Sequence, residues 1–304
     1  MRASIGLIVF FSMALSVRCQ VNLRVLGTVQ DAGAPQIGCS KSCCIDRFND
    51  TNASLKVCSI GLVDNQNTYI IDATPDFTSQ NHDLNNYAGV GSKFIVDGVF
   101  LTHAHIGHYT GLMYLGREAL GAKKVSVYAM PKFVDFIENN GPWEQLVALG
   151  NINLKPLQKD QWITLSDNLS IKPLKVPHRD EYSETVGYLI QGPKKSALFI
   201  PDIDKWSKWS HSIVDFVKQV DYAFLDATFY DQKELPGRDM SEIPHPFAIE
   251  SMKLFSTLNS SDKSKIYFIH LNHTNPLLNS KSKAYKKVIE DGYNVARINQ
   301  NFSL

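Results

Sequence analysis

Short runs of apolar and β-branched residues, separated by Gly, Pro, Asn or Asp, recur along most of the chain. Their alternation of apolar and polar positions predicts strands over residues 21–28, 59–63, 68–71, 98–101, 125–129, 169–174, 186–190, 197–200, 222–225 and 266–269. Apolar residues spaced three and four apart predict helices over residues 111–120, 132–139, 212–220, 246–258 and 281–291. Strands and helices alternate in both halves of the chain, which indicates an α/β fold.

The beginning of the chain has a different pattern. Arg2 precedes an apolar run over residues 5–17, and polar sequence resumes at Gln20. This arrangement predicts a signal peptide over residues 1–19, an exported protein and a single domain over residues 20–304, with a buried N-terminal helix as the alternative. The run is shorter than the roughly 20 apolar residues that cross a bilayer, so we expect no membrane anchor.

Composition and charge narrow the choice of partner. The 304 residues are 44% apolar and 20% charged, which is typical of a globular protein. Lys and Arg number 31 against 30 for Asp and Glu, and like charges do not cluster. We therefore expect a small-molecule substrate and no nucleic acid partner, while the oligomeric state stays open.

The strongest chemical signal is a group of three histidines, His103, His105 and His108, in the stretch LTHAHIGHYTGL over residues 101–112. His103 and His105 are two apart on an extended segment, so they project to the same side. His108 opens the helix predicted near Tyr109 and can point back at them. Three imidazoles suit zinc, and iron or manganese when carboxylates assist.

This motif resembles the His-x-His-x-Asp-His pattern of the metallo-β-lactamase superfamily. The resemblance implies an αββα four-layer sandwich and further ligands at the ends of later strands. The implied first metal site comprises His103, His105 and His178, with Asp202 as the bridging carboxylate and Asp204 as its rival. The implied second site comprises His108, Asp202 and His270.

One position departs from the pattern, because Gly107 stands where the family has an aspartate that binds the second metal ion. Glycine has no side chain that could bind a metal. The second site is then weak or empty, or another group takes over.

Two further residues resemble parts of the tRNA-processing nucleases of the superfamily. Asp226 matches an acidic residue that lies beside their metals, and His245 precedes a predicted helix much as their auxiliary histidine does. A carboxylate and an imidazole in contact could hold a proton for the leaving group, which makes the pair a catalytic candidate. The alternative is that Asp226 caps a strand and His245 caps a helix.

Three longer stretches resemble the pyrroloquinoline quinone synthesis protein B family. They are VLGTVQDAGAPQIGC at residues 25–39, IDATPDF at residues 71–77 and HLNHTNP at residues 270–276. The resemblance spans nearly all of residues 20–304, and it implies a relative of that family with a substrate of its own.

The cysteines allow two interpretations. Three of them bunch within six positions, which favours a structural zinc over disulfides. In the family just named and in the related cyclic phosphodiesterases, N-terminal cysteines hold such an ion. In the cyclic phosphodiesterases, a histidine three residues past the last active-site ligand completes the site. That resemblance implies a set of Cys39, Cys43, Cys44 and His273, with Cys58 as a substitute.

Three functions remain open on these grounds. The first is a zinc-dependent hydrolase that acts on an ester, phosphodiester or lactone through metal-activated water. The second is an iron-dependent oxidation step in the synthesis of pyrroloquinoline quinone or a related cofactor. The third is a carrier for a quinone or its precursor, without catalysis.

Overall fold

Two β-sheets form the centre of the computed structural model, which describes residues 20–50 and 53–304. Each sheet has seven strands within these residues. In spatial order, the first sheet contains β14 (Asn301–Ser303), β1 (Val21–Gly27), β2 (Ser59–Asp64), β3 (Asn67–Ile71), β4 (Gly98–Phe100), β5 (Val125–Ala129) and β6 (Ile152–Pro156). The second contains β13 (Asn294–Val295), β12 (Ile266–Ile269), β11 (Tyr222–Asp226), β10 (Ser196–Ile200), β9 (Val186–Gln191), β8 (Ser170–Lys175) and β7 (Ile163–Thr164). The predicted signal peptide, residues 1–19, lies outside the described residues.

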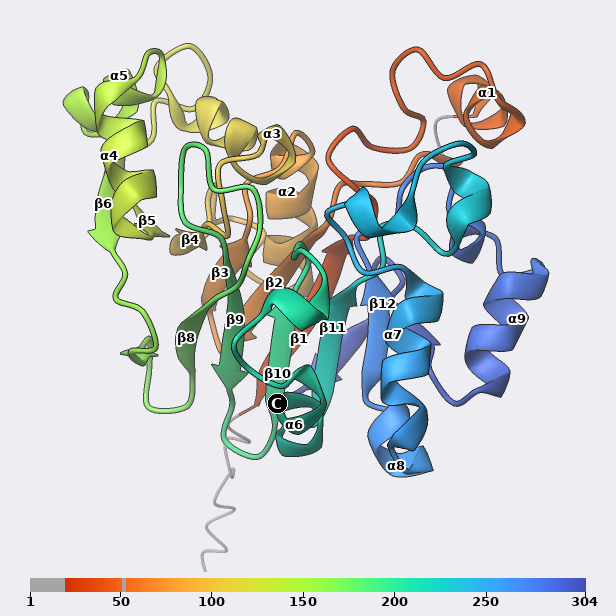
Figure 1. Cartoon of the computed structure of the whole chain (residues 1–304). Coiled ribbons are helices and arrows are strands. Elements are labelled where there is room, and N and C mark those ends of the chain that lie inside the picture. The colour runs from red at the N-terminus through yellow and green to blue at the C-terminus, as the bar shows by residue number, and fades with distance from the viewer. Residues whose placement is uncertain (1–19, 51–52) are drawn as a thin grey trace, which may run out of the picture.

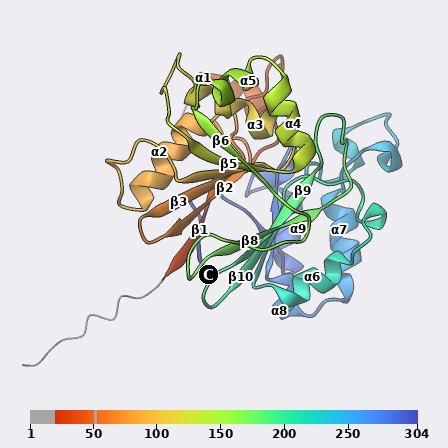
Figure 2. The same ribbon diagram turned by 90° about the vertical axis from the view of Figure 1, so that its left-hand side faces the viewer.

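Helices cover the outer face of each sheet (Figures 1 and 2). The first sheet carries α2 (Phe77–Tyr87), α3 (Ile106–Tyr109), α4 (Pro131–Asn139) and α5 (Trp143–Ala148). The second carries α6 (Ile213–Gln219), α7 (Ala248–Leu254), α8 (Ser260–Lys263) and α9 (Lys283–Glu290), while α1 (Ser42–Asn49) lies at one end of the sandwich. The predicted αββα four-layer sandwich is confirmed. In the described part of the chain, no helix combines the length and the apolar character needed to cross a membrane.

Three apolar clusters fill the three interfaces between these layers. The cluster between the sheets includes Leu23, Tyr188 and Phe199. A second cluster joins the first sheet to its helices, and a third joins the second sheet to its own helices. Strand β10 shows how one strand contributes to two of these clusters. Its residues are all buried, with Phe199 facing the other sheet and Leu198 facing the helices. A strand that is covered on both faces is a nearly continuous apolar run, here residues 197–200.

All ten predicted strands occur, each within one residue of its predicted bounds. The strands that the pattern missed are β6, β7, β13 and β14, which are short or lie towards sheet edges and so carry fewer buried residues. Helix α2 was also missed, because its buried face includes the polar residues Gln80 and Asn85. The helix predicted over residues 111–120 was wrong in part: a 3-10 helix covers only Thr110–Leu115.

Candidate metal centre

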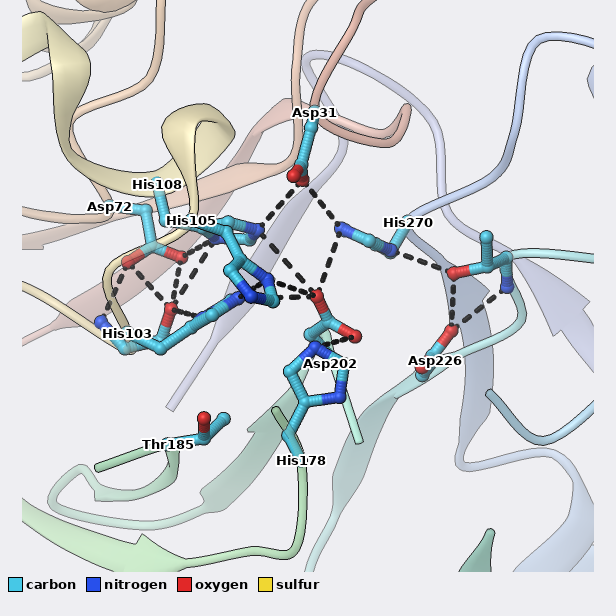
Figure 3. A network of polar contacts seen from close by, with 12 residues as sticks. Asp31, Asp72, His103, His105, His108, His178, Thr185, Asp202, Asp226 and His270 are labelled. Carbon is cyan, nitrogen blue, oxygen red and sulfur yellow. Dashed lines mark hydrogen bonds and ion pairs between the residues drawn. The ribbon is translucent and has the colours of Figure 1, made fainter. Parts of the chain in front are cut away.

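The ends of several strands deliver polar side chains to one edge of the sandwich. Strands β10, β11 and β12 are parallel, so Asp202, Asp226 and His270 meet at their carboxyl ends. From the same edge, β8 leads to His178 and β4 leads to His103 (Figure 3). Ligand sites in layered folds with parallel strands form at this edge.

A first donor group contains His103, His105, His178 and Asp202, whose ligand atoms all lie within 4.8 Å of one another. Asp202 Oδ2 lies 3.3 Å from His103 Nε2, and Asp202 Oδ1 lies 3.3 Å from His178 Nε2. His105 contributes Nδ1, 4.0 Å from Asp202 Oδ2. The structure therefore brings together the four residues that the sequence assigned to the first site.

The two candidate carboxylates near His178 occupy different places. Asp202 is buried and faces the imidazoles, whereas Asp204 Oδ1 lies 3.7 Å from His178 Nδ1, on the opposite side of the ring. Asp204 is thus placed to orient His178, and Asp202 to contact a ligand.

Two chains of hydrogen bonds, here called relays, each run from an aspartate through a threonine to a buried imidazole and fix its orientation. The Thr102 hydroxyl donates to Asp72 at 2.9 Å and lies 2.9 Å from His103 Nδ1, so His103 Nδ1–H donates to Thr102. The Thr228 hydroxyl donates to Asp226 at 2.8 Å and accepts in the same way from His270 Nδ1, at 2.9 Å. In both relays the Nε2 lone pair is left facing the centre. Such outer partners are what hold metal-binding histidines in the right tautomer.

A second donor group contains Asp31, His108, Asp202 and His270, again within 4.8 Å. His108 Nδ1 lies 2.7 Å from Asp72, which directs His108 Nε2 towards Asp31 Oδ1, 3.1 Å away. Burial would raise the pKa of Asp31, but its contacts with His108 and His270 hold that pKa well below the usual value. The sequence analysis did not identify Asp31. The available signal was Gly107, which left open that another group takes the place of the motif aspartate.

A third cluster joins Asp226 and His245 to Asp202. His245 Nδ1 lies 2.9 Å from Asp226 Oδ2 and 3.2 Å from Asp202 Oδ1. Burial acts to lower the pKa of His245, but the two carboxylates outweigh it and raise the pKa to about 10. The predicted pair is thus in contact, and Asp226 also belongs to the relay that orients His270.

The donor chemistry of this centre fits a metal ion. Three of its buried atoms have no hydrogen-bond partner among the described residues: His178 Nε2, Asp202 Oδ1 and His270 Nε2. Buried polar atoms are nearly always paired, so unpaired ones gathered around Asp202 indicate a site for a ligand. Three imidazoles with a carboxylate, beside two imidazoles with two carboxylates, suit zinc, iron or manganese.

The cysteines form a separate group. Cys39, Cys43, Cys44 and His273 place their ligand atoms within 4.8 Å of one another, and their thiols are free. Cys58 lies instead in the core between the sheets, so it is not a substitute in this group. The group connects the first loop and α1 to the segment that follows His270.

Comparison with known proteins places this centre in context. Residues 67–271 match the family described as the Beta-lactamase superfamily domain. The chain belongs to this superfamily.

Individual relatives are also similar to this chain over most of its length. Coenzyme PQQ synthesis protein B of Xanthomonas axonopodis pv. citri is 23% identical, over 90% of this chain and 96% of the relative. The crystal structure of Zn(2+)-bound PqqB from Methylobacterium extorquens has a TM-score of 0.76 at 19% identity, and covers 93% of this chain and 100% of that one. A diphosphatase of the PhnP family has a TM-score of 0.64 at 22% identity, and covers 94% and 97%. The resemblance to the PqqB family thus extends over nearly the whole described chain, and the structures share its fold.

Proposed function

We propose that this member of the superfamily is a metal-dependent hydrolase of an ester, phosphodiester or lactone. The observation that carries the proposal is the buried group of His103, His105, His178 and Asp202, with its unpaired atoms gathered around Asp202. The similarity to Zn(2+)-bound PqqB supports zinc as the ion. A bound ion of this kind lowers the pKa of a coordinated water towards about 7 and polarises a substrate oxygen.

The residues around the group determine how a substrate reaches it. The side chains of His103, His178 and Asp202 are at most 3% exposed, so they are shielded from bulk water. The side chains of His105, His245 and Asp31 are 15%, 14% and 15% exposed, so they form the part of the centre that reaches solvent. A substrate that enters there meets the donor group and the Asp226–His245 pair together.

The contact between Asp226 and His245 supports a role for His245 in proton transfer. His245 Nδ1 contacts both carboxylates, so the positive charge of a protonated ring is stabilised at the edge of the centre. From this position His245 can donate the proton that a departing alkoxide needs, while Asp226 holds the ring in place.

The names of the relatives suggest the source of the substrate. The matched relatives are coenzyme PQQ synthesis proteins, and the similarity spans 90% of this chain. We therefore propose a substrate drawn from the synthesis of this cofactor or of a related quinone. Iron-dependent oxidation and quinone binding without turnover are the competing outcomes of the test below.

The test combines metal analysis with turnover of the purified protein. Protein isolated without added metal is analysed for zinc, iron and manganese, and assayed with p-nitrophenyl acetate, bis(p-nitrophenyl) phosphate and a γ-lactone. We expect hydrolysis that His103→Ala and Asp202→Ala reduce to background while circular dichroism shows an intact fold. His82→Ala is the matched control, because His82 is exposed and lies outside the donor groups, with a side-chain hydrogen bond to Asn86.

Each contrary result has a distinct meaning. Normal hydrolysis in either variant would refute the assignment. Bound iron with oxygen-dependent turnover would replace it by oxidation, and a metal-free folded protein with a co-purifying quinone would replace it by a carrier.

A further inference from the structure

The space beside Gly107 is already filled by another residue. A Cβ atom built on Gly107 would lie 2.5 Å from Asp31 Cα and 2.6 Å from Asp31 Oδ1. The first of these neighbours is backbone, so it cannot turn aside as a flexible side chain would. Gly107 also has an ordinary negative φ and sits inside α3, so the close approach, and not the backbone conformation, requires glycine here.

The Asp31 carboxylate lies where a carboxylate on residue 107 would reach. Its Oδ1 atom is about as far from the built Cβ as the oxygen of an aspartate is from its own Cβ. The same Oδ1 lies 3.1 Å from His108 Nε2 and 3.5 Å from His270 Nε2. Across the group, Asp202 Oδ2 lies 4.0 Å and 3.9 Å from these two nitrogens.

The imidazoles of His108 and His270 are each held through Nδ1, so that their Nε2 atoms can bind a ligand. Asp72 holds Nδ1 of His108, and Thr228 holds Nδ1 of His270. Among the described residues, His270 Nε2 is buried without a hydrogen-bond partner, although it is aimed into the group and lies 3.5 Å from Asp31 Oδ1 (Figure 3). An unpaired buried nitrogen is costly unless it binds something.

The backbone fixes Asp31 relative to His270. Gln30 N–H donates to Leu271 O at 3.0 Å, and Leu271 N–H donates to Thr28 O at 2.9 Å. These bonds join the first loop to the residue directly after His270. Asp31 therefore belongs to a rigid part of the centre, as a metal ligand must.

We propose that Asp31 replaces the motif aspartate as the carboxylate ligand of a second metal ion, bound by Asp31, His108, Asp202 and His270, and that Gly107 provides the space for this exchange. The carboxylate has moved from the histidine motif to a loop 77 positions away from His108. The inference shares the metal centre with the proposed function, but it requires neither hydrolysis nor any particular substrate.

The test counts metal ions and does not measure turnover, so it can fail or succeed independently of the hydrolase assignment. Metal-stripped protein is titrated with Zn²⁺ and Co²⁺, and bound ions per chain are counted by elemental analysis and by Co²⁺ absorption. We expect Asp31→Asn to weaken one binding step by more than about 100-fold, beyond the range typical of outer partners. Asp46→Asn is the control, because Asp46 is an exposed acid in the same N-terminal segment.

A pair of substitutions tests the exchange itself. Gly107→Asp alone should lose the same binding step and melt at a lower temperature, because its Cβ collides with Asp31. Combined with Asp31→Gly, it should recover part of the binding step, because the carboxylate returns to residue 107 and the collisions with the Asp31 side chain are removed. The contact with the Cα atom of residue 31 remains, and the glycine-containing loop must shift to relieve it. A full metal count in Asp31→Asn would overturn the proposal.

A further measurement covers variants that do not fold. Anomalous scattering from crystals of the unmodified protein grown with Zn²⁺ should show a peak within bonding distance of Asp31, His108 and His270. A peak at His103, His105 and His178 without this second one would overturn the proposal.

Discussion

Asp72 is a buried carboxylate whose removal should impair metal binding more than folding. Its side chain is fully buried and accepts hydrogen bonds from Thr102 N at 2.8 Å, from the Thr102 hydroxyl at 2.9 Å and from His108 Nδ1 at 2.7 Å. Because a carboxylate can only accept, it forces the His108 proton onto Nδ1 and leaves Nε2 free. Through Thr102 it imposes the same tautomer on His103.

The substitution Asp72→Asn keeps the shape and reverses this preference. The amide oxygen can still accept from Thr102 N, but the amide NH₂ would face His108 Nδ1 and donate to it. The His108 proton then moves to Nε2, the atom that should bind the metal. Loss of about one charge-assisted hydrogen bond predicts a destabilisation of about 1.5–3 kcal/mol, whereas metal affinity should fall about 10- to 100-fold.

The assay measures both quantities on the same protein. Urea denaturation followed by circular dichroism gives the free energy of unfolding, and zinc titration of the metal-stripped protein gives the affinity. Asp97→Asn is the matched control, because Asp97 accepts from Thr68 N at 2.8 Å near the other end of strand β3. It should cost at most about 1 kcal/mol, since Asp97 is partly exposed and pairs with Lys93. Unchanged zinc affinity in Asp72→Asn, or an equal fall in both variants, would refute the reasoning.

Three further predictions concern the surroundings of the centre. Burial raises the pKa of Glu234 from its ordinary 4.5 to about 7, so the folded protein holds this proton more tightly than the unfolded chain. The stabilisation from this group is complete below about pH 4.5 and is lost as the pH rises through about 7. In urea denaturation, the free energy of unfolding of Glu234→Gln relative to the unmodified protein should therefore be roughly 1–3 kcal/mol higher at about pH 8 than at about pH 5. The same difference between the two proteins at both pH values would exclude this. Cys39→Ser should remove about one zinc per chain and lower the melting temperature, because it takes a donor from the group that ties α1 to His273; an unchanged zinc count would contradict a structural site. His245→Ala should slow hydrolysis of alkyl esters about 100-fold more than that of p-nitrophenyl esters, which have a good leaving group; equal slowing would exclude His245 as the proton donor.

The regular strands and the group of three histidines were accessible from the sequence because their signals are local, whereas His178, Asp202 and His270 were assigned through the resemblance to the superfamily. A strand buried on both faces is mostly apolar, as residues 197–200 of β10 are, and its end is marked by polar residues that follow. His103 and His105 lie two apart on one extended segment, while Asp202 and His270 follow buried strands. Helix α2 gave no such signal, since Gln80 is buried through bonds to Thr74 and to the carbonyl of Val57, which its own sequence cannot reveal.

The sequence by itself therefore determined the α/β class, the buried strands, and the histidines and aspartates at the strand ends. It also showed that Gly107 leaves the motif without its carboxylate. Only the tertiary structure decided what fills that place, because Asp31 and His108 are 77 positions apart and no local pattern relates them. Their approach depends on backbone bonds between the first loop and Leu271, which form only when the two sheets pack together.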